Sequence, residues 1–266
     1  MPAMTAAPNI LVFDSGLGGL TVFREVVSAR PDARFVYAAD DAFFPYGRQD
    51  EAVLVERVLK VMGDLIAAHR PDLVVVACNT ASVQALAQLR QKFEIPFVGT
   101  VPAIKPACSS SNSKLVSVLG TEATVKREYT RKLVAEHGNN CGVTLVGSPH
   151  LAEMGEAELN GSPAADGDIL AELTPCFVTA GDRRTDTIVL ACTHFPLLLQ
   201  RLERLSPWPV RFIDPAPAIA RRVVDLLGPS SGSAKPLPAQ AIFTSGKAPS
   251  IALAAALAGF GLAAGV

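Results

Sequence analysis

Neither a surplus of charge of one sign nor an abundance of aromatic residues marks this chain of 266 residues. Its 24 lysine and arginine residues are balanced by 25 aspartate and glutamate residues, for a formal net charge of −1. This balance excludes a broad basic surface for nucleic acid. The aromatic share of 6% argues against stacking platforms for single strands. We therefore expect no nucleic-acid partner.

Long apolar segments and paired cysteine motifs are missing as well. The first apolar run stops at Asp14 and follows no basic residue, unlike a signal peptide. The apolar tail 251–266 contains Gly259 and Gly261 and is shorter than the roughly 20 residues that span a membrane, so we expect a packed terminal helix. The five cysteines form no CxxC motif, which favours reduced thiols in a cytoplasmic protein with no membrane association.

What the chain does contain is a large share of apolar residues, arranged in short runs. Hydrophobic residues make up 49% and charged residues 18%, enough for a folded core, and at about 150 residues per domain the length favours two small domains. Apolar runs typical of buried strands alternate with helical patterns such as 50–69, which predicts an α/β fold with mainly parallel sheets. A Gly/Pro/Ser-rich stretch, 228–240, is predicted to be a connection. The predicted strands are Asn9–Phe13, Arg34–Ala39, Leu73–Ala77, Pro96–Val98, Lys114–Leu119, Val143–Val146, Thr187–Ala191, Val210–Ile213 and Ala241–Thr244.

One local pattern occurs twice. Residues 73–80 read LVVVACNT and residues 188–194 read IVLACTH, so each apolar strand ends in Ala-Cys followed by polar residues and a helical pattern. The repeat suggests two similar α/β domains, each offering a cysteine at the carboxyl end of a strand. Open α/β sheets place ligand chemistry at that end.

Cys78 and Cys192 are therefore the leading candidates for chemistry. Where a helix begins, its free N–H groups and dipole favour an anion, either a thiolate or a substrate carboxylate. His194 stands two residues after Cys192 and could accept or return a proton. A zinc site from these two cysteines and His194 is an alternative that lacks an evident fourth ligand. The remaining cysteines are predicted to be structural, namely Cys108, Cys141 and Cys176.

Two loops after strands complete the candidates. Residues 14–19 read DSGLGG, but a dinucleotide fingerprint would need glycine where the chain has Thr21. The loop is thus a turn that brings Asp14 and Ser15 to a strand end, either for function or as helix caps. Residues 40–47 read DDAFFPYG and form either a functional loop or a rigid turn.

Taken together, these pieces resemble glutamate racemase, of the cofactor-independent aspartate/glutamate racemase superfamily. The matching segments follow the family's order and span most of the chain: VFDSGLGGLTV (12–22), YAADDAFFPYG (37–47), VVVACNTAS (74–82), VLACTHFPLL (189–198) and FIDPAPAIA (212–220). The resemblance implies two α/β domains with the active site in the cleft between them. Their expected bounds are 1–98 together with 212–266, and 99–211.

The resemblance also implies roles for individual residues. Cys78 and Cys192 would be the catalytic pair, with Cys78 taking the α-proton from D-glutamate and Cys192 taking it from L-glutamate. An acidic residue eight positions beyond Ser148 would assist, which selects Glu156 over Glu153; Asp14 and His194 would assist as well. The substrate contacts would be Asp14, Ser15, Tyr46, Gly47, Asn79, Thr80, Thr193 and His194.

Two positions depart from the family's pattern. Ser148 stands where a cysteine is usual, and Arg127 stands near a common serine. These changes concern the surroundings of the pocket rather than the two thiols.

The implied reaction is the interconversion of L- and D-glutamate, which would supply D-glutamate for peptidoglycan. Inversion needs a proton removed from one face and delivered to the other, so two thiols suit it. The sequence has no signature for a metal or a cofactor, so we expect neither. The expected assembly is a homodimer. The alternatives are a racemase of aspartate or another small amino acid, a non-catalytic amino-acid-binding protein and a zinc hydrolase.

Overall fold

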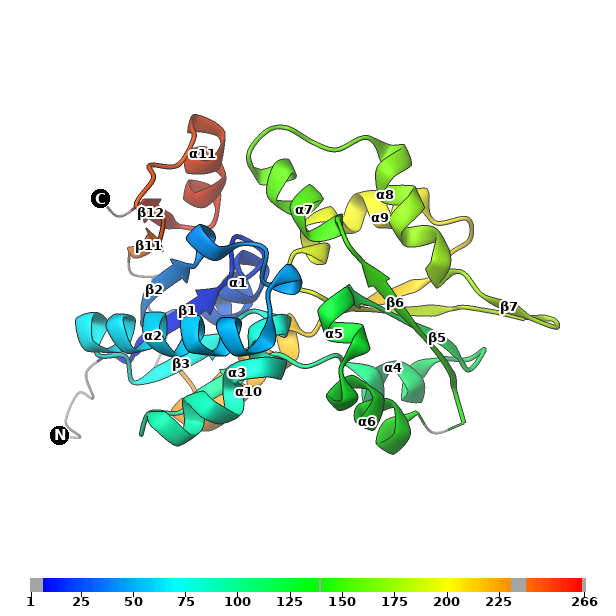
Figure 1. The fold of residues 1–266 in the computed structure, drawn as a ribbon, viewed down its shortest axis with the longest axis horizontal. Coiled ribbons are helices and arrows are strands. Elements are labelled where there is room, and N and C mark those ends of the chain that lie inside the picture. Colours follow the sequence, from blue (N-terminus) through cyan, green and yellow to red (C-terminus); the bar gives the residue numbers. More distant parts are fainter. Residues whose placement is uncertain (1–6, 139, 231–237, 265–266) are drawn as a thin grey trace.

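Two parallel sheets organise the computed structural model, which describes residues 7–138, 140–230 and 238–264 (Figure 1). The first sheet has six strands in the order β12-β11-β2-β1-β3-β4, and all its pairings are parallel. In the middle of this sheet Val12 lies opposite both Tyr37 and Val75. Its strands are β1 (Asn9–Asp14), β2 (Arg34–Ala39), β3 (Leu73–Val76), β4 (Phe97–Gly99), β11 (Ala239–Phe243) and β12 (Leu262–Ala264).

The second sheet has four strands in the order β10-β9-β5-β6, again all parallel. Its strands are β5 (Leu115–Thr121), β6 (Gly142–Ser148), β9 (Thr187–Ala191) and β10 (Arg211–Ile213). A small antiparallel ribbon joins β7 (Thr179–Ala180) to β8 (Arg183–Arg184). The predicted α/β fold with mainly parallel sheets is confirmed.

Helices cover the faces of both sheets. On the first sheet, α1 (Leu20–Ala29), α10 (Ala216–Leu227) and α11 (Ile251–Gly259) contribute to one core, and α2 (Glu51–His69) and α3 (Asn79–Lys92) to the other. The second sheet packs mainly against α4, α6, α7, α8 and α9. The helices of this second part are α4 (Ile104–Ser110), α5 (Glu122–Lys126), α6 (Glu128–His137), α7 (Leu151–Leu159), α8 (Asp166–Leu173) and α9 (Leu199–Leu205).

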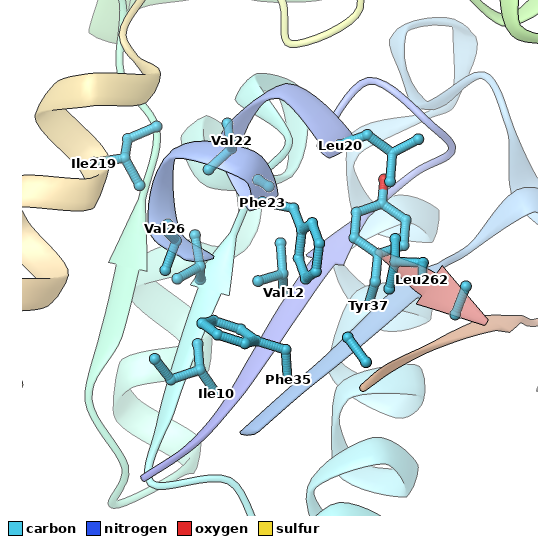
Figure 2. Packing of buried hydrophobic residues seen from close by; sticks show 14 of the residues in the cluster. Ile10, Val12, Leu20, Val22, Phe23, Val26, Phe35, Tyr37, Ile219 and Leu262 are labelled. Atoms are coloured by element: carbon cyan, nitrogen blue, oxygen red, sulfur yellow. The ribbon is translucent and has the colours of Figure 1, made fainter. Parts of the chain in front are cut away.

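Alternation along β1 shows why its sequence is apolar without interruption. Ile10 and Val12 enter the core beneath α1 and α10, where Figure 2 shows Val12 beside Phe23 and Ile10 beside Phe35. Leu11 and Phe13 enter the core on the opposite face. A strand covered on both faces needs apolar side chains on both, so the run ends only at Asp14, where the strand reaches the cleft described below.

Local signals set the ends of the longest helix. Asp50 caps α2 by accepting hydrogen bonds from the N–H groups of Ala52 and Val53, at 2.9 and 3.3 Å. The helix ends where Arg70 adopts a left-handed conformation (φ 45°) before Pro71, because a residue preceding proline disfavours the helical region. The predicted helix over 50–69 is thus confirmed to within one residue.

The apolar tail differs from its prediction as one terminal helix. Helix α11 stops at Gly259, and β12 then pairs with β11 at the edge of the first sheet. Gly261 has a φ of 77°, a conformation that glycine adopts without a steric penalty and that breaks the helix. Of the predicted connection 228–240, residues 231–237 lie outside the described residues, and 239–240 belong to β11.

The chain crosses between the sheets twice. After β4 it enters the second sheet, and after β10 it returns to the first through α10, β11 and β12. Phe212 and Ile213 still pair with β9 in the second sheet. The domain bounds of 1–98 with 212–266, and 99–211, stay a prediction.

Candidate active site

A cleft lies where the carboxyl ends of strands from both sheets meet. It encloses about 580 Å³, including its open mouth. Five strands each place a lining residue at their carboxyl end or within two positions beyond it, namely Ser15 (β1), Cys78 (β3), Thr121 (β5), Ser148 (β6) and Cys192 (β9). Parallel sheets collect side chains of different strands at this edge. The other lining residues are Phe44, Pro45, Tyr46, Gly47, Arg48, Asn79, Thr80, Glu122, Pro149, Ala152, Glu153, Thr193 and His194.

Cys78 is the N-cap residue of α3, as its pattern predicted. Its Sγ accepts a hydrogen bond from the N–H of Ala81 at 3.5 Å and lies 3.6 Å from the Oγ of Ser15, which in turn is 3.5 Å from Asp14 Oδ1. The side chain is buried. Burial, followed by the charge of Asp14, raises the pKa of the Cys78 thiol well above its usual range, despite the two hydrogen bonds.

Cys192 has a different neighbour, the imidazole of His194. Its Sγ is 3.8 Å from His194 Nδ1, and His194 Nε2 is 2.7 Å from Glu156 Oε1. Burial lowers the pKa of His194, but the hydrogen bonds to Cys192 and Glu156 and the charges of Glu156 and Asp14 outweigh it and raise the pKa well above its ordinary value. As an imidazolium, His194 donates from both nitrogens, one toward the sulfur and one toward the carboxylate.

The helical segment after Cys192 begins later than predicted. Whereas α3 starts directly after Cys78, a 3₁₀ helix starts only at Phe195, and Phe195 N–H donates to the Cys192 carbonyl at 3.1 Å to close a turn. Pro196 has no N–H and suits the first turn of a helix, which places the start here. The predicted helix N-terminus exists at Cys78 and is wrong at Cys192.

Asp14 lies behind the cleft rather than on its wall. It is fully buried, and its Oδ2 accepts a hydrogen bond from the Gly19 N–H at 2.9 Å. Burial raises the pKa of Asp14 above its ordinary value, although the charge of His194 and the Gly19 N–H oppose this. Glu156 lies behind the cleft too, and its Oε1 accepts from the Leu17 N–H at 2.6 Å as well as facing His194.

Glycines in the first loop permit these close approaches. A Cβ on Gly16 would collide with the carboxylate of Glu156, and one on Gly18 would collide with the ring and backbone of His194. On the other side, a Cβ on Gly155 would come within 2.9 Å of the His194 carbonyl. The glycine-rich turn therefore serves to bring two segments from different sheets into contact.

Most of the predicted site residues meet in this one place. Of the predicted set, Cys78, Cys192, Ser15, Tyr46, Gly47, Asn79, Thr80, Thr193 and His194 line the cleft. Asp14 and Glu156 stand directly behind it, and Glu153 lies on its wall, where it pairs with Arg48 at 2.8 Å. The Tyr46 hydroxyl is not directed at the cleft, because it donates a hydrogen bond to Asp40 at 2.6 Å.

Several lining residues were missed by the sequence reasoning. Thr121 and Ser148 close strands β5 and β6, so the strand-end rule applied to every predicted strand would have selected both. Arg48 bridges the mouth of the cleft by donating hydrogen bonds to Glu153 and to the Pro149 carbonyl, which both belong to the part of the chain around the second sheet. No sequence signal pairs residues about a hundred positions apart.

The part of the chain that the structure describes holds neither a metal-binding cluster nor a membrane-spanning helix. Across 7–138, 140–230 and 238–264, no group of three or more histidine, cysteine, aspartate or glutamate side chains is arranged to hold a metal ion. Within the same ranges no helix is long and apolar enough to cross a membrane. All five cysteines are free thiols.

Comparison with known proteins decides the family. The family model described as Asp/Glu/Hydantoin racemase matches residues 15–223. This chain belongs to that family. Glutamate racemase of Brucella anthropi is 52% identical over 230 residues, covering 86% of this chain and 83% of its own. Glutamate racemase of Brucella ovis is 50% identical over 264 residues, covering 97% and 95%.

Solved structures of this racemase family agree in fold. Escherichia coli glutamate racemase, in complex with L-glutamate and the activator UDP-MurNAc-Ala, has a TM-score of 0.88 at 38% identity, over 97% of both chains. Glutamate racemase from Thermus thermophilus, in complex with β-chloro-D-alanine, has a TM-score of 0.73 at 27% identity, covering 98% of this chain and 96% of its own. The racemase resemblance of the sequence is confirmed.

Proposed function

We propose that this racemase interconverts L-glutamate and D-glutamate without a cofactor, by proton transfer between two thiols. The observation that carries the proposal is that Cys78 and Cys192 follow strands of different sheets and line one cleft. Inversion of an α-carbon needs an acid and a base on opposite faces. Two sulfur atoms that approach from two sheets meet this need without any movement of a catalytic group around the substrate.

Glutamate is supported as the substrate by the relatives and by the helix N-terminus that opens at the cleft. The curated relatives at 52% and 50% identity are glutamate racemases. The N-terminus of α3 opens at the cleft with Asn79 and Thr80 in its first turn, where free N–H groups favour a carboxylate. Among the described residues neither the Nδ2 nor the Oδ1 of the buried Asn79 amide has a partner, and a bound carboxylate would accept a hydrogen bond from Nδ2.

We assign the substrate contacts accordingly. The α-carboxylate would lie against Asn79 and Thr80 and the hydroxyl of Thr193. The remaining assigned contacts are Asp14, Ser15, Tyr46, Gly47 and His194, of which only Asp14 is behind the wall of the cleft.

In the L-to-D direction the Cys192 thiolate takes the α-proton, and the C–H electron pair moves onto the α-carbon and its carboxylate. The Cys78 thiol then donates its proton to the opposite face and is left as a thiolate. Cys78 suits the role of resting acid because burial raises its thiol pKa. His194, held by Glu156, faces the sulfur of Cys192 and assists its proton exchange. The reverse direction exchanges the two roles.

The wider setting is also part of the proposal. D-glutamate made here would serve peptidoglycan synthesis in the cytoplasm. Residues 1–98 with 212–266, and 99–211, would form two domains that close over the substrate and exclude water. The enzyme would act as a homodimer, which sedimentation of the pure protein would test by its mass.

Circular dichroism of L-glutamate incubated with the pure protein tests the reaction directly. We expect the signal to decay to zero as the racemate forms, with no added cofactor, and to decay equally after treatment with a chelator and a pyridoxal phosphate scavenger. Decay of L-aspartate alone would identify a different racemase. Binding of glutamate without any decay would identify a binding protein, and activity restored only by zinc would defeat the two-thiol route.

A further inference from the structure

A buried carboxylate outside the cleft ties three segments of the first sheet together. Asp40 directly follows β2 and is fully buried. Its oxygens accept hydrogen bonds from Arg57 Nε and Nη2 at 3.0 and 2.6 Å, from Tyr46 Oη at 2.6 Å and from Thr244 Oγ1 at 2.6 Å. The donors come from α2, from the loop before it and from the residue after β11. Asp40 does not line the cleft.

These contacts keep Asp40 charged. Burial raises the pKa of its carboxyl, but the hydrogen bonds from Arg57, Thr244 and Tyr46 outweigh burial and leave the pKa below its ordinary value. An ionised carboxylate only accepts hydrogen bonds, so all of its neighbours point their donors at it. The bidentate guanidinium fixes the direction of both oxygens.

The network fixes a segment that lines the cleft. The ring of Tyr46 is buried in the core between the sheet, α2 and α3, its hydroxyl is held by Asp40, and Phe43 meets the ring edge-on at 6.3 Å. Arg57 covers Phe43 as well, 5.8 Å from the ring centroid. Because Tyr46 is anchored at its ring and its hydroxyl, the backbone of residues 45–47 at the cleft wall has little freedom to shift.

We propose that Asp40 and Arg57 are positioning residues of this enzyme, which hold Tyr46 and thereby the Pro45–Gly47 segment in the place where substrate binds. This inference rests on the proposed function, which assigns Tyr46 and Gly47 as substrate contacts. Neither Asp40 nor the Arg57 guanidinium lines the cleft. The pair therefore acts on substrate binding and leaves the proton transfers between the two thiols unchanged.

Substitution of Arg57 is the main test, in which KM and kcat are measured separately and their changes are compared. We expect Arg57→Leu to raise KM for both glutamate enantiomers about tenfold, because small displacements of positioning groups have effects of this order or larger. The kcat should stay within about twofold, the pattern of lost uniform binding. Arg57→Lys keeps the charge and one contact, so KM should return to within about threefold of the parent.

The chain offers a matched control at the other end of β2. Arg30 and Asp32 also form a bidentate pair, at 2.9 and 2.8 Å, in which Arg30 is buried and Asp32 partly buried; it lies just before that strand, at the end away from the cleft. Arg30→Leu and Arg57→Leu should both lower the melting temperature, but Arg30→Leu should leave KM unchanged. Tyr46→Phe, which removes only the hydroxyl contact, should raise KM about threefold.

Binding without turnover separates this inference from the proposed reaction. Calorimetry measures the affinity for D-glutamate of Cys78→Ser and of the double variant Cys78→Ser/Arg57→Leu. The double variant should bind about tenfold more weakly than Cys78→Ser. An unchanged KM and affinity in folded Arg57→Leu would overturn the positioning role, as would a loss confined to kcat or an equal KM increase in Arg30→Leu. If the parent protein binds glutamate but does not racemise it, the proposed function fails while the affinity comparison still tests the pair.

Discussion

Cys78 and Cys192 each follow an interior strand of a parallel sheet, but the groups that touch their sulfur atoms differ. Cys78 caps α3 and is paired with a hydroxyl, that of Ser15. Cys192 precedes an open turn and is paired with His194, which Glu156 holds. The repeated sequence pattern thus places the two cysteines in equivalent positions, but the group beside each sulfur differs: a hydroxyl beside Cys78 and an imidazole beside Cys192. The two halves of the site are alike in the position of the cysteine after its strand and distinct in acid–base chemistry.

The largest expected effect tests whether both halves are needed. Cys78→Ala and Cys192→Ala should each slow racemisation at least about a thousandfold, within the range that positioned acids and bases contribute. Racemisation is followed by circular dichroism, and folding by the melting curve. Cys141→Ala is the control, because that half-buried thiol lies outside the cleft. Near-parental turnover in either folded cleft variant would contradict the two-thiol mechanism.

The next prediction assigns each thiol to one face of the substrate. A glutamate analogue with a good leaving group at its β-carbon can eliminate after one deprotonation, so a single base suffices. Cys78→Ser should keep elimination from the L analogue and lose it from the D analogue about a hundredfold, and Cys192→Ser should show the opposite. Serine keeps the shape but is a far weaker acid. Equal residual elimination from both enantiomers in both variants would end the assignment.

His194 should matter on one face only. Because the equilibrium constant of racemisation is one, kcat/KM must change equally in both directions in any variant, so the asymmetry is visible only in the irreversible elimination. We expect His194→Gln to slow elimination from the L analogue about tenfold, the factor that corresponds to one pKa unit. Elimination from the D analogue should change less than twofold. Equal losses on both analogues would show that His194 serves the whole cleft.

The same histidine predicts how stability depends on pH. The pKa of His194 is raised in the folded protein, so the folded state holds this proton more tightly than the unfolded chain, whose pKa is about 6.5. The stabilisation is complete below that pH and is lost as pH rises toward the folded pKa, at up to about 1.4 kcal/mol per pH unit. Urea unfolding at pH 6.5, 7.25 and 8 should show the parent losing about 1 kcal/mol more than His194→Gln. Parallel pH profiles would mean that the pKa of His194 is the same in the folded and the unfolded state.

Much of this site could be predicted because it obeys a local rule. Buried parallel strands show as continuous apolar runs, and the polar residue at each carboxyl end then marks the cleft. Ser15, Cys78 and Cys192 were found in this way, and Thr121 and Ser148 obey the same rule. Glu156 was selected by family spacing, and in the fold it is Glu156 that faces His194.

What escaped prediction depends on contacts between distant segments. Asp40 and Thr244 meet across 204 positions, and no periodicity encodes such a pair. Gly16 and Gly18 were interpreted only as part of a turn that presents Asp14 and Ser15, whereas their missing Cβ atoms make room for Glu156 and His194. Apolar composition in the tail could not distinguish the helix from the edge strand β12 that follows it.

The smallest effect concerns the hydroxyl beside Cys78. Ser15 Oγ is 3.6 Å from the sulfur and 3.5 Å from Asp14 Oδ1, long contacts that contribute at the low end of hydrogen-bond energies, about 0.5 kcal/mol. We therefore expect Ser15→Ala to slow elimination from the D analogue only two- to threefold and to leave the L analogue unchanged. With His194→Gln, this variant completes a crossed pair in which each substitution weakens a different face. A tenfold loss in Ser15→Ala on the D analogue would instead mean that the two halves of the site rely equally on their neighbours, and the contrast between hydroxyl and imidazole would then have no kinetic consequence.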